Sequence, residues 1–288
     1  MNGANNNCAI WKQCDSDSDD SVSTFSSAPL WNHKGVKCAS LLSHEMQSLE
    51  KKLQRIIFIQ QTDQSYHLAL DDIRDQSEIS LLVEPSFYGR HCSTSVIAIA
   101  TSNNTYIFDV RALGKIFKSL SELLEAKVPR KIMHYSHRIC DLFAHKHNIK
   151  IDGICDTFVE LCVVRQDRGL CSLREAISLT LNIPMSELTC DEIESPRESV
   201  RNFTGRPLSK DQLQILGKLA ILQQKLHDRL IYGNICTELQ QMTTNFSYEF
   251  KKHSNSTEEI ALNMAPESKI GTECINQFYL ISTKMSDS

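Results

Sequence analysis

Acidic and histidine side chains in the middle of the chain are of the types that bind divalent metal ions. Glu84 directly follows an apolar, β-branched run, and Asp141 lies in a stretch that also holds His134, His137, His145 and His147. Two carboxylates could form a weak single-metal site, although isolated acids of this kind are more often solvated or paired with a nearby base. The histidines lack the cysteine spacing of a zinc site, so the sequence predicts no bound metal.

Other catalytic chemistries have little support in the sequence. No Gly-x-Ser-x-Gly motif marks a nucleophile elbow, and the sparse glycines, Gly233 included, form no phosphate-cradling loop. Asp156 stands at an expected strand-to-helix junction, where a helix N-cap is a more common role than a metal ligand. The 11 cysteines include no Cys-x-x-Cys pair and no signal segment opens the chain, so we expect reduced thiols in a cytosolic or nuclear protein.

Positive charge gathers in two stretches, although the formal net charge of the chain is −4. Residues 127–150 carry six Lys/Arg and four His against one acid, and residues 197–229 carry seven Lys/Arg against three acids. Such stretches can hold a single strand of nucleic acid by its phosphates, although basic helix faces are commonly just solvated. The best candidates for nucleic-acid contact are Arg90, His91, Lys131, His134, His137, Arg138 and Arg206, with Tyr88 or Tyr135 as a stacking partner.

Composition divides the chain into a globular middle and two polar ends. Residues 1–35 are rich in Asn and then in Ser and Asp, so we expect a disordered acidic tail there. Residues 36–65 are expected to be a helical lead-in, because Leu41 to Ile59 places apolar residues near helical spacing. Residues 66–235 then form the folded domain, and residues 236–288 a mostly flexible tail. No apolar run is long enough to cross a membrane.

The middle of the chain alternates between strand-like and helix-like patterns. β-Branched runs with short polar breaks predict three consecutive strands, at 79–83, 95–100 and 105–110. Further helices are expected at 115–126, 136–147, 156–164 and 172–181, with short strands at 131–133 and 153–155. Ser209 and Gln212 form a capping-box pattern that opens a last helix, whose apolar stripe holds Ile215, Leu219, Leu222 and Leu226. This order implies an α/β fold, a mixed sheet with helices on both faces and disordered tails.

The order of elements and motifs resembles the ribonuclease D-like 3′–5′ exonucleases of the DEDD superfamily, from about Tyr66 to Leu230. The landmarks are Phe-Asp-Val at 108–110, His134 followed by Asp141, the pair Asp156 and Thr157, and Arg-Pro-Leu-Ser at 206–209. Within the superfamily the chain looks most like the exonuclease 3′–5′ domain-containing proteins of the piRNA pathway, on residues 58–76, 84–91 and 100–110. The resemblance implies a ribonuclease H-like mixed sheet flanked by helices.

Active members of that superfamily hold two divalent metal ions on four carboxylates, and the resemblance assigns those positions here. Glu84 and Asp141 match two of the acids. Leu82 and Leu219 stand where the other two are expected, and Ile215 stands where a residue would orient water. Two carboxylates cannot neutralise two dications about 3.5–4 Å apart. The resemblance therefore implies a degenerate site without catalytic residues, which core side chains fill.

The sequence thus favours a non-catalytic RNA-binding adaptor, a pseudo-exonuclease without a cofactor. The resemblance further implies piRNA biogenesis and transposon silencing in cytoplasmic germline granules, a homodimer and a Tudor-domain partner. The relatives also carry a Sm-like module, of which residues 36–65 would be a remnant. Two alternatives stay open: an active Mg²⁺- or Mn²⁺-dependent 3′–5′ exoribonuclease that uses Glu84, Asp141 and further, unrecognised acids, and a protein-interaction scaffold without RNA contact.

Overall fold

The computed structural model describes residues 39–84, 93–166, 169–189 and 203–248. Within these residues six strands form one mixed sheet in the order β1-β4-β3-β2-β5-β6. Their bounds are β1 Ile56–Ile59, β2 Glu78–Glu84, β3 Val96–Ala100, β4 Thr105–Asp109, β5 Arg130–Met133 and β6 Ile154–Asp156. β3 is antiparallel to β2 and β4, whereas the pairs β1–β4, β2–β5 and β5–β6 are parallel. The predicted mixed sheet with its three-strand meander is confirmed.

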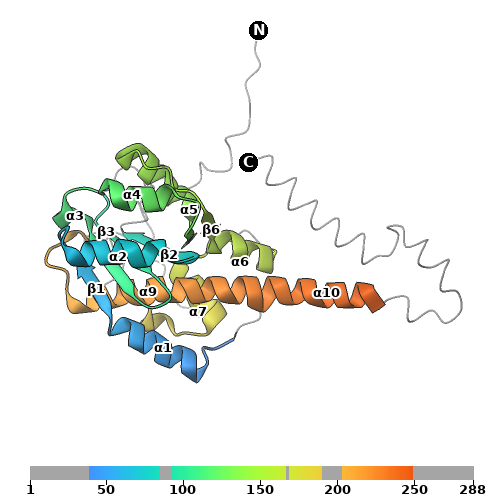
Figure 1. Ribbon diagram of the computed structural model, residues 1–288. Coiled ribbons are helices and arrows are strands. Elements are labelled where there is room, and N and C mark those ends of the chain that lie inside the picture. Colours follow the sequence, from blue (N-terminus) through green and yellow to red (C-terminus); the bar gives the residue numbers. More distant parts are fainter. Residues whose placement is uncertain (1–38, 85–92, 167–168, 190–202, 249–288) are drawn as a thin grey trace, which may run out of the picture. The chain divides into compact units, whose positions relative to one another are not determined.

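Helices connect the strands and flank the sheet (Figure 1). The α-helices are α1 Ser43–Leu53, α2 Gln64–Arg74, α3 Val110–Leu113, α4 Lys118–Glu125, α5 Ser136–Leu142, α6 Thr157–Arg165, α7 Leu173–Leu181, α9 Lys210–Asp228 and α10 Thr237–Tyr248. A π-helix, η3 Phe143–His147, follows α5, and a 3₁₀ turn, η4 Met185–Glu187, follows α7. A second π-helix, η5 Arg229–Cys236, joins α9 to α10, so that the three run along one line in Figure 1. No helix of the described ranges is long and apolar enough to span a membrane.

Side chains of the central strands alternate between two apolar clusters, one on each face of the sheet. In β2, Leu81 and Val83 belong to the cluster that includes residues of α2, α4 and α5. Leu82 belongs to the cluster that includes residues of α7 and α9, which we call the α9-side cluster. This alternation follows from the two-residue repeat of a strand, and helices on both faces are confirmed.

The first half of the chain departs from the predicted helical lead-in. A single helix over residues 41–59 is wrong, because α1 ends at Leu53 and Ile56–Ile59 form β1. The four residues of β1 pair in parallel with residues 105–108 of β4, which satisfies backbone groups that a helix would have bonded internally. The sequence pattern also missed α2, whose N-cap Asp63 accepts a hydrogen bond from the Tyr66 backbone N–H at 3.1 Å. Within the expected lead-in, Ile56–Ile59 therefore form an edge strand of the sheet.

The beginning of the C-terminal region is helical rather than a flexible tail. α10 extends to Tyr248, although the segment is rich in Thr and Ser. Its hydroxyls donate to the carbonyl four residues earlier, as Thr243 Oγ1 does to Leu239 O at 2.8 Å and Ser247 Oγ to Thr243 O at 2.7 Å. This bonding lets short polar side chains stay within a helix. The expectation of disorder for residues 1–35 and from residue 249 onward lies outside the described residues.

Candidate functional site

The positions that the resemblance assigns to metal ligands begin on β2, in the middle of the sheet. Leu82 pairs with Ala98 of β3, and Ala98 pairs with Ile107 of β4, so the three form a row across the sheet. All three belong to the α9-side cluster, and the Leu82 residue is 7% exposed. Glu84 lies two residues further along β2, on the same face as Leu82. It is also 7% exposed and has a polar interaction in the structure.

Two residues of α9 fix how this helix lies on the sheet. A Cβ atom on Gly217 would lie 2.7 Å from Ile56 Cδ1, so the absent side chain permits close approach to β1. Gln223 is fully buried, and its Nε2 donates to Ser80 Oγ, Leu81 O and Ile132 O at 2.9, 3.1 and 2.7 Å. These bonds tie the helix to β2 and β5. The position of Leu219, between Gly217 and Gln223, is therefore set by both contacts.

Ile215 and Leu219 pack in the same α9-side cluster as Leu82. Leu219 is 1% exposed, and Leu222 and Leu226 of the same stripe are completely buried. The predicted core-facing stripe of the last helix is confirmed. Three of the five positions that would form a two-metal site are thus apolar side chains within one hydrophobic cluster. These residues do not fit a pair of dications, because hydrocarbon side chains offer no ligand oxygen and exclude water.

The second retained acid, Asp141, lies near the end of α5. Its Oδ1 is 3.4 Å from His145 Nε2, one helical turn further along in η3. Within the described ranges no three His, Cys, Asp or Glu side chains are grouped so that they could hold a metal ion. The predicted absence of a metal nevertheless remains a prediction.

Three predicted nucleic-acid contacts bind groups within the protein, and two of them, Lys131 and His134, are buried. Lys131 on β5 is completely buried, its Nζ donates to Ala126 O, and burial lowers its pKa to about 8, with Asp152 opposing the shift. His134 is buried with Nδ1 2.9 Å from Thr157 Oγ1 and Nε2 2.8 Å from Cys171 O. Burial lowers the pKa of His134, so the ring is neutral at pH 7 and Nε2 donates to the carbonyl. Neither side chain lies where it could meet a phosphate.

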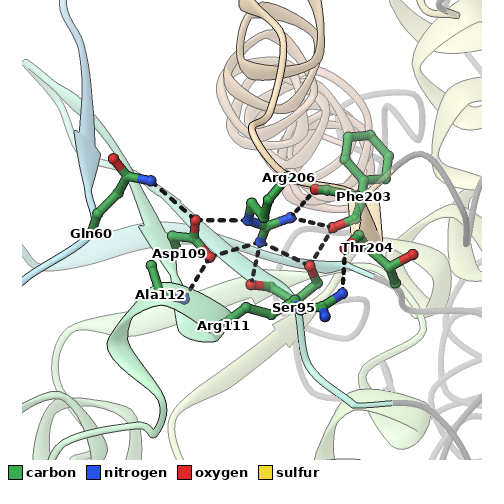
Figure 2. Close-up of polar contacts among 9 residues, drawn as sticks. Gln60, Ser95, Asp109, Arg111, Ala112, Phe203, Thr204 and Arg206 are labelled. Carbon is green, nitrogen blue, oxygen red and sulfur yellow. Dashed lines mark hydrogen bonds and ion pairs between the residues drawn. The ribbon is translucent and has the colours of Figure 1, made fainter.

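The third residue, Arg206, is half-buried and forms an ion pair with the completely buried Asp109 (Figure 2). Its Nε donates to Asp109 Oδ2 at 2.8 Å, and one terminal nitrogen donates to Asp109 Oδ1 at 2.7 Å. The same nitrogen donates to Ser95 O at 3.2 Å, and the other donates to Phe203 O at 2.9 Å. Burial alone would raise the pKa of Asp109, but the hydrogen bonds from Arg206 and the Ala112 N–H outweigh it and lower that pKa. Arg206 therefore ties the segment before α9 to the ends of β3 and β4.

His137 and Arg138 remain as the predicted contacts that reach the surface, at the start of α5. His137 is exposed and Arg138 half-buried, and both have polar interactions within the protein. Arg90, His91 and Tyr88 lie outside the described residues. Tyr135, the other predicted stacking residue, is half-buried beside Arg138, whose Cζ lies 5.2 Å from the centre of the Tyr135 ring.

The loop from β5 to α5 is positioned by Asp156. Its Oδ1 accepts from the Tyr135 and Phe158 N–H groups at 3.2 and 2.9 Å, and its Oδ2 accepts from the Ser136 N–H at 2.7 Å. The predicted N-cap role of Asp156 is confirmed for α6. Sequence reasoning missed Phe158, whose ring lies 4.4 Å from that of Tyr135. Its position directly after Asp156 and Thr157 was the signal in the sequence that could have pointed to Phe158.

Comparison with known proteins identifies the family. "Protein Exd1 homolog" of Drosophila melanogaster is 47% identical over 235 residues, which are 81% of this chain and 86% of that protein. The chain belongs to the Exd1 family. A second relative, "piRNA biogenesis protein EXD1" of Bombyx mori, is 31% identical over 168 residues, and the match covers 55% of this chain and about half, 52%, of that protein. No protein-family model matches the chain.

Solved structures of other proteins share the fold of this chain. Trypanosoma brucei RNase D in a GMP complex superposes with a TM-score of 0.53 at 15% identity, covering 63% of this chain and 59% of that one. Escherichia coli RNase D gives 0.51 at 14% identity, covering 62% and 44%. The predicted ribonuclease H-like 3′–5′ exonuclease fold and the exonuclease-like resemblance are confirmed. At these identities the structures bear on the fold alone.

Proposed function

We propose that this Exd1-family chain binds single-stranded RNA through an exonuclease fold without cleaving it, and that it acts in piRNA biogenesis. The observation that carries the first part is the packing of Leu82, Ile215 and Leu219 in one apolar cluster, at positions where an active relative needs two acids and a water-orienting group. A water molecule activated for attack on a phosphodiester needs metal or base at that place. Neither Leu nor Ile supplies one.

The RNA-binding part is supported by charge at the surface around α5 and η3. Lys146 and Lys150 are exposed there, and Arg138 is half-buried. Cations spread along one surface bind the phosphates of a single strand and release its counterions. A structure of the same fold, Trypanosoma brucei RNase D, is in complex with RNA U12. The piRNA part is supported by the names of relatives, "piRNA biogenesis protein EXD1" in Bombyx mori and Homo sapiens. We extend the proposal to a homodimer with a Tudor-domain partner in cytoplasmic germline granules.

The second candidate function is a metal-dependent 3′–5′ exoribonuclease. The observation in its favour is that Glu84 and Asp141 are retained, with Glu84 on the same face of β2 as the site would require. In that case Glu84 would be the acid whose loss affects activity most.

The test incubates the full chain with 3′-labelled single-stranded RNA in Mn²⁺ and measures binding of the same RNA at increasing salt. We expect no shortening of the RNA and an affinity that falls steeply with salt. Shortening that Glu84→Ala abolishes would establish the exonuclease instead. If the RNA is neither shortened nor bound, the result would favour the protein-interaction scaffold. Arg138→Gln should weaken this salt-sensitive binding. Arg74→Gln, which removes an arginine from an exposed i,i+3 pair with Asp71 on α2, is the matched control and should not.

A further inference from the structure

The helix α10 carries an apolar stripe that the described part of the protein does not bury. None of the residues of α10 is buried, and among the described elements its extensive contacts are with η5, the helix that it continues. Leu239 is 49% exposed and Phe246 is 47% exposed, whereas Ile235 and Met242 are half-buried. These four residues, which we call the α10 stripe, are spaced by four, three and four positions. They therefore follow one face of the helix.

The spacing of the α10 stripe is that of the a and d positions of a coiled coil, where apolar side chains of two helices interlock. Leu239 and Phe246 stand at a positions, and Ile235 and Met242 stand at d positions. Apolar side chains on a helix without buried residues stay in contact with water unless another element covers them. The repeat suits a second helix as that element, because a helix presents side chains at the same intervals.

The charge of α10 favours a second copy of this chain as the covering helix. Glu238 is the single charged residue from Thr237 to Tyr248, so the helix has no row of charges that could select an acidic or a basic partner. RNA would find no cation there to bind its phosphates. A copy of α10 is an amphipathic helix of matching length, and two copies meet without rows of like charges that repel each other.

An antiparallel pair of α10 helices places the stripe in matched layers. A two-fold axis halfway along the stripe sets Ile235 of each copy opposite Phe246 of the other. The same axis sets Leu239 opposite Met242, as a symmetric dimer requires. A parallel pair would bring two folded domains, each with a radius of gyration of roughly 16 Å, to the same end of helices whose axes are about 8–10 Å apart. Because α10 continues the line of α9 beyond the sheet, the antiparallel pair keeps the two domains at opposite ends (Figure 1).

We propose that two copies of this chain pair through the α10 stripe as an antiparallel two-helix coiled coil. This inference rests on the homodimer in the proposed function and deepens it, because it names the surface at which the copies meet. Four layers of side chains form a small interface, so the dimer dissociates at concentrations on the order of micromolar.

The test measures the oligomeric state of the full chain by sedimentation velocity at protein concentrations from about 1 to about 200 µM. Leu239→Gln places an amide in two of the four layers, so it should weaken the dimer at least about tenfold. Leu68→Gln is the matched control, because Leu68 is 60% exposed on α2, and it should leave the dimer unchanged. Both variants should keep a native circular dichroism spectrum, since neither replaces a buried residue.

A pair of charge substitutions tests the direction of the helices. In the antiparallel pair Glu238 of each copy lies beside Asn245 of the other, whereas in a parallel pair it lies beside Thr243. Asn245→Lys should therefore tighten the dimer by about twofold or more at low salt, and Thr243→Lys should not. If Thr243→Lys tightens the dimer instead, or if neither variant does, the antiparallel arrangement is refuted.

The outcomes separate this inference from the proposed function. If the wild type remains a monomer at every concentration, the homodimer of the proposed function fails together with the α10 pairing. If a dimer forms and Leu239→Gln leaves it intact, the α10 pairing alone is refuted and the copies meet elsewhere. RNA binding is measured independently by the salt titration, so its failure or success does not decide the pairing.

Discussion

Changing Arg206 to Met tests the ion pair that joins the segment before α9 to the sheet. The substitution keeps a long side chain that can cover the same surface but removes every hydrogen bond of the Arg206 guanidinium shown in Figure 2. Asp109 is completely buried and would keep the 3.1 Å bond from the Ala112 N–H and a long, 3.4 Å bond from Gln60 Nε2. The Asp109 carboxyl would thus stay in a buried place without a counter-charge from Arg206.

The expected loss of stability follows from the burial of Asp109. Breaking a buried ion pair by removing one partner costs about 3–5 kcal/mol, because the remaining charge has lost both water and its partner. The lower end applies here, since the Arg206 side chain is 23% exposed and water can reach the space it leaves. A loss of about 3 kcal/mol lowers the melting temperature by about 6–12 °C for a domain of this size.

Urea unfolding followed by circular dichroism measures the loss, with Asp109→Asn combined with Arg206→Met as the matched control. The double variant should recover much of the stability because no charge is left buried. The pKa of Asp109 is lowered in the folded protein, so the pair contributes fully above the ordinary carboxyl pKa of about 4 and is lost as pH falls through the lower folded value. The difference between wild type and Arg206→Met should therefore shrink in acid. A single variant that loses under about 1 kcal/mol, or a pH-independent difference, would refute the reasoning.

Three further changes test the packing around the candidate site. Gly217→Ala should cost about 1–3 kcal/mol because its Cβ meets Ile56, whereas Gly233→Ala, whose Cβ meets Arg229 Cδ at 3.9 Å, should not, as urea midpoints can show. Gln223→Leu should cost about 1–3 kcal/mol because two buried carbonyls and Ser80 Oγ lose a donor, and slow amide exchange in β2 and β5 should speed up. Lys131 has a folded pKa of about 8, below its ordinary 10.5, so the unfolded chain binds more protons between these values and wild-type stability rises with pH there. Lys131→Met should lack that rise, and parallel stability curves for the two proteins from pH 8 to 10.5 would contradict this.

Much of the architecture was predictable because apolar periodicity reports directly on burial. The runs that became β2, β3 and β4 are buried on both faces, and their short length and β-branched side chains favour strands over buried helices. The stripe of α9 was predictable for the same reason, with Ser209 marking its first turn. Leu82 and Leu219 could be assigned to one place because the resemblance fixed both positions relative to neighbouring motifs.

The remaining site depends on contacts between residues far apart in the chain, which periodicity does not report. Arg206 appeared to be a phosphate ligand because a cation in a basic stretch looks accessible, yet Asp109, 97 residues away, pairs with it. Lys131 and His134 were predicted to be accessible for the same reason. A polar side chain can be buried when another residue accepts its hydrogen bond, and the sequence pattern does not show that partner. β1 was taken for helix because an edge strand beside a preceding helix can show the same apolar spacing.

The apolar row of Leu82, Ala98 and Ile107 under α9 also constrains how this sequence can change over generations. A lone Leu82→Asp or Leu219→Asp substitution would bury a carboxylate in hydrocarbon and would cost several kcal/mol, a large share of the 5–15 kcal/mol that stabilises a typical domain. Neither step gains a metal by itself, since the other ligand position would still be leucine. Each single step toward a four-carboxylate site therefore destabilises the fold. Both leucines would have to be replaced together before metal binding could offset that loss. The packing of Leu82 and Leu219 therefore makes each single substitution toward a carboxylate costly in stability.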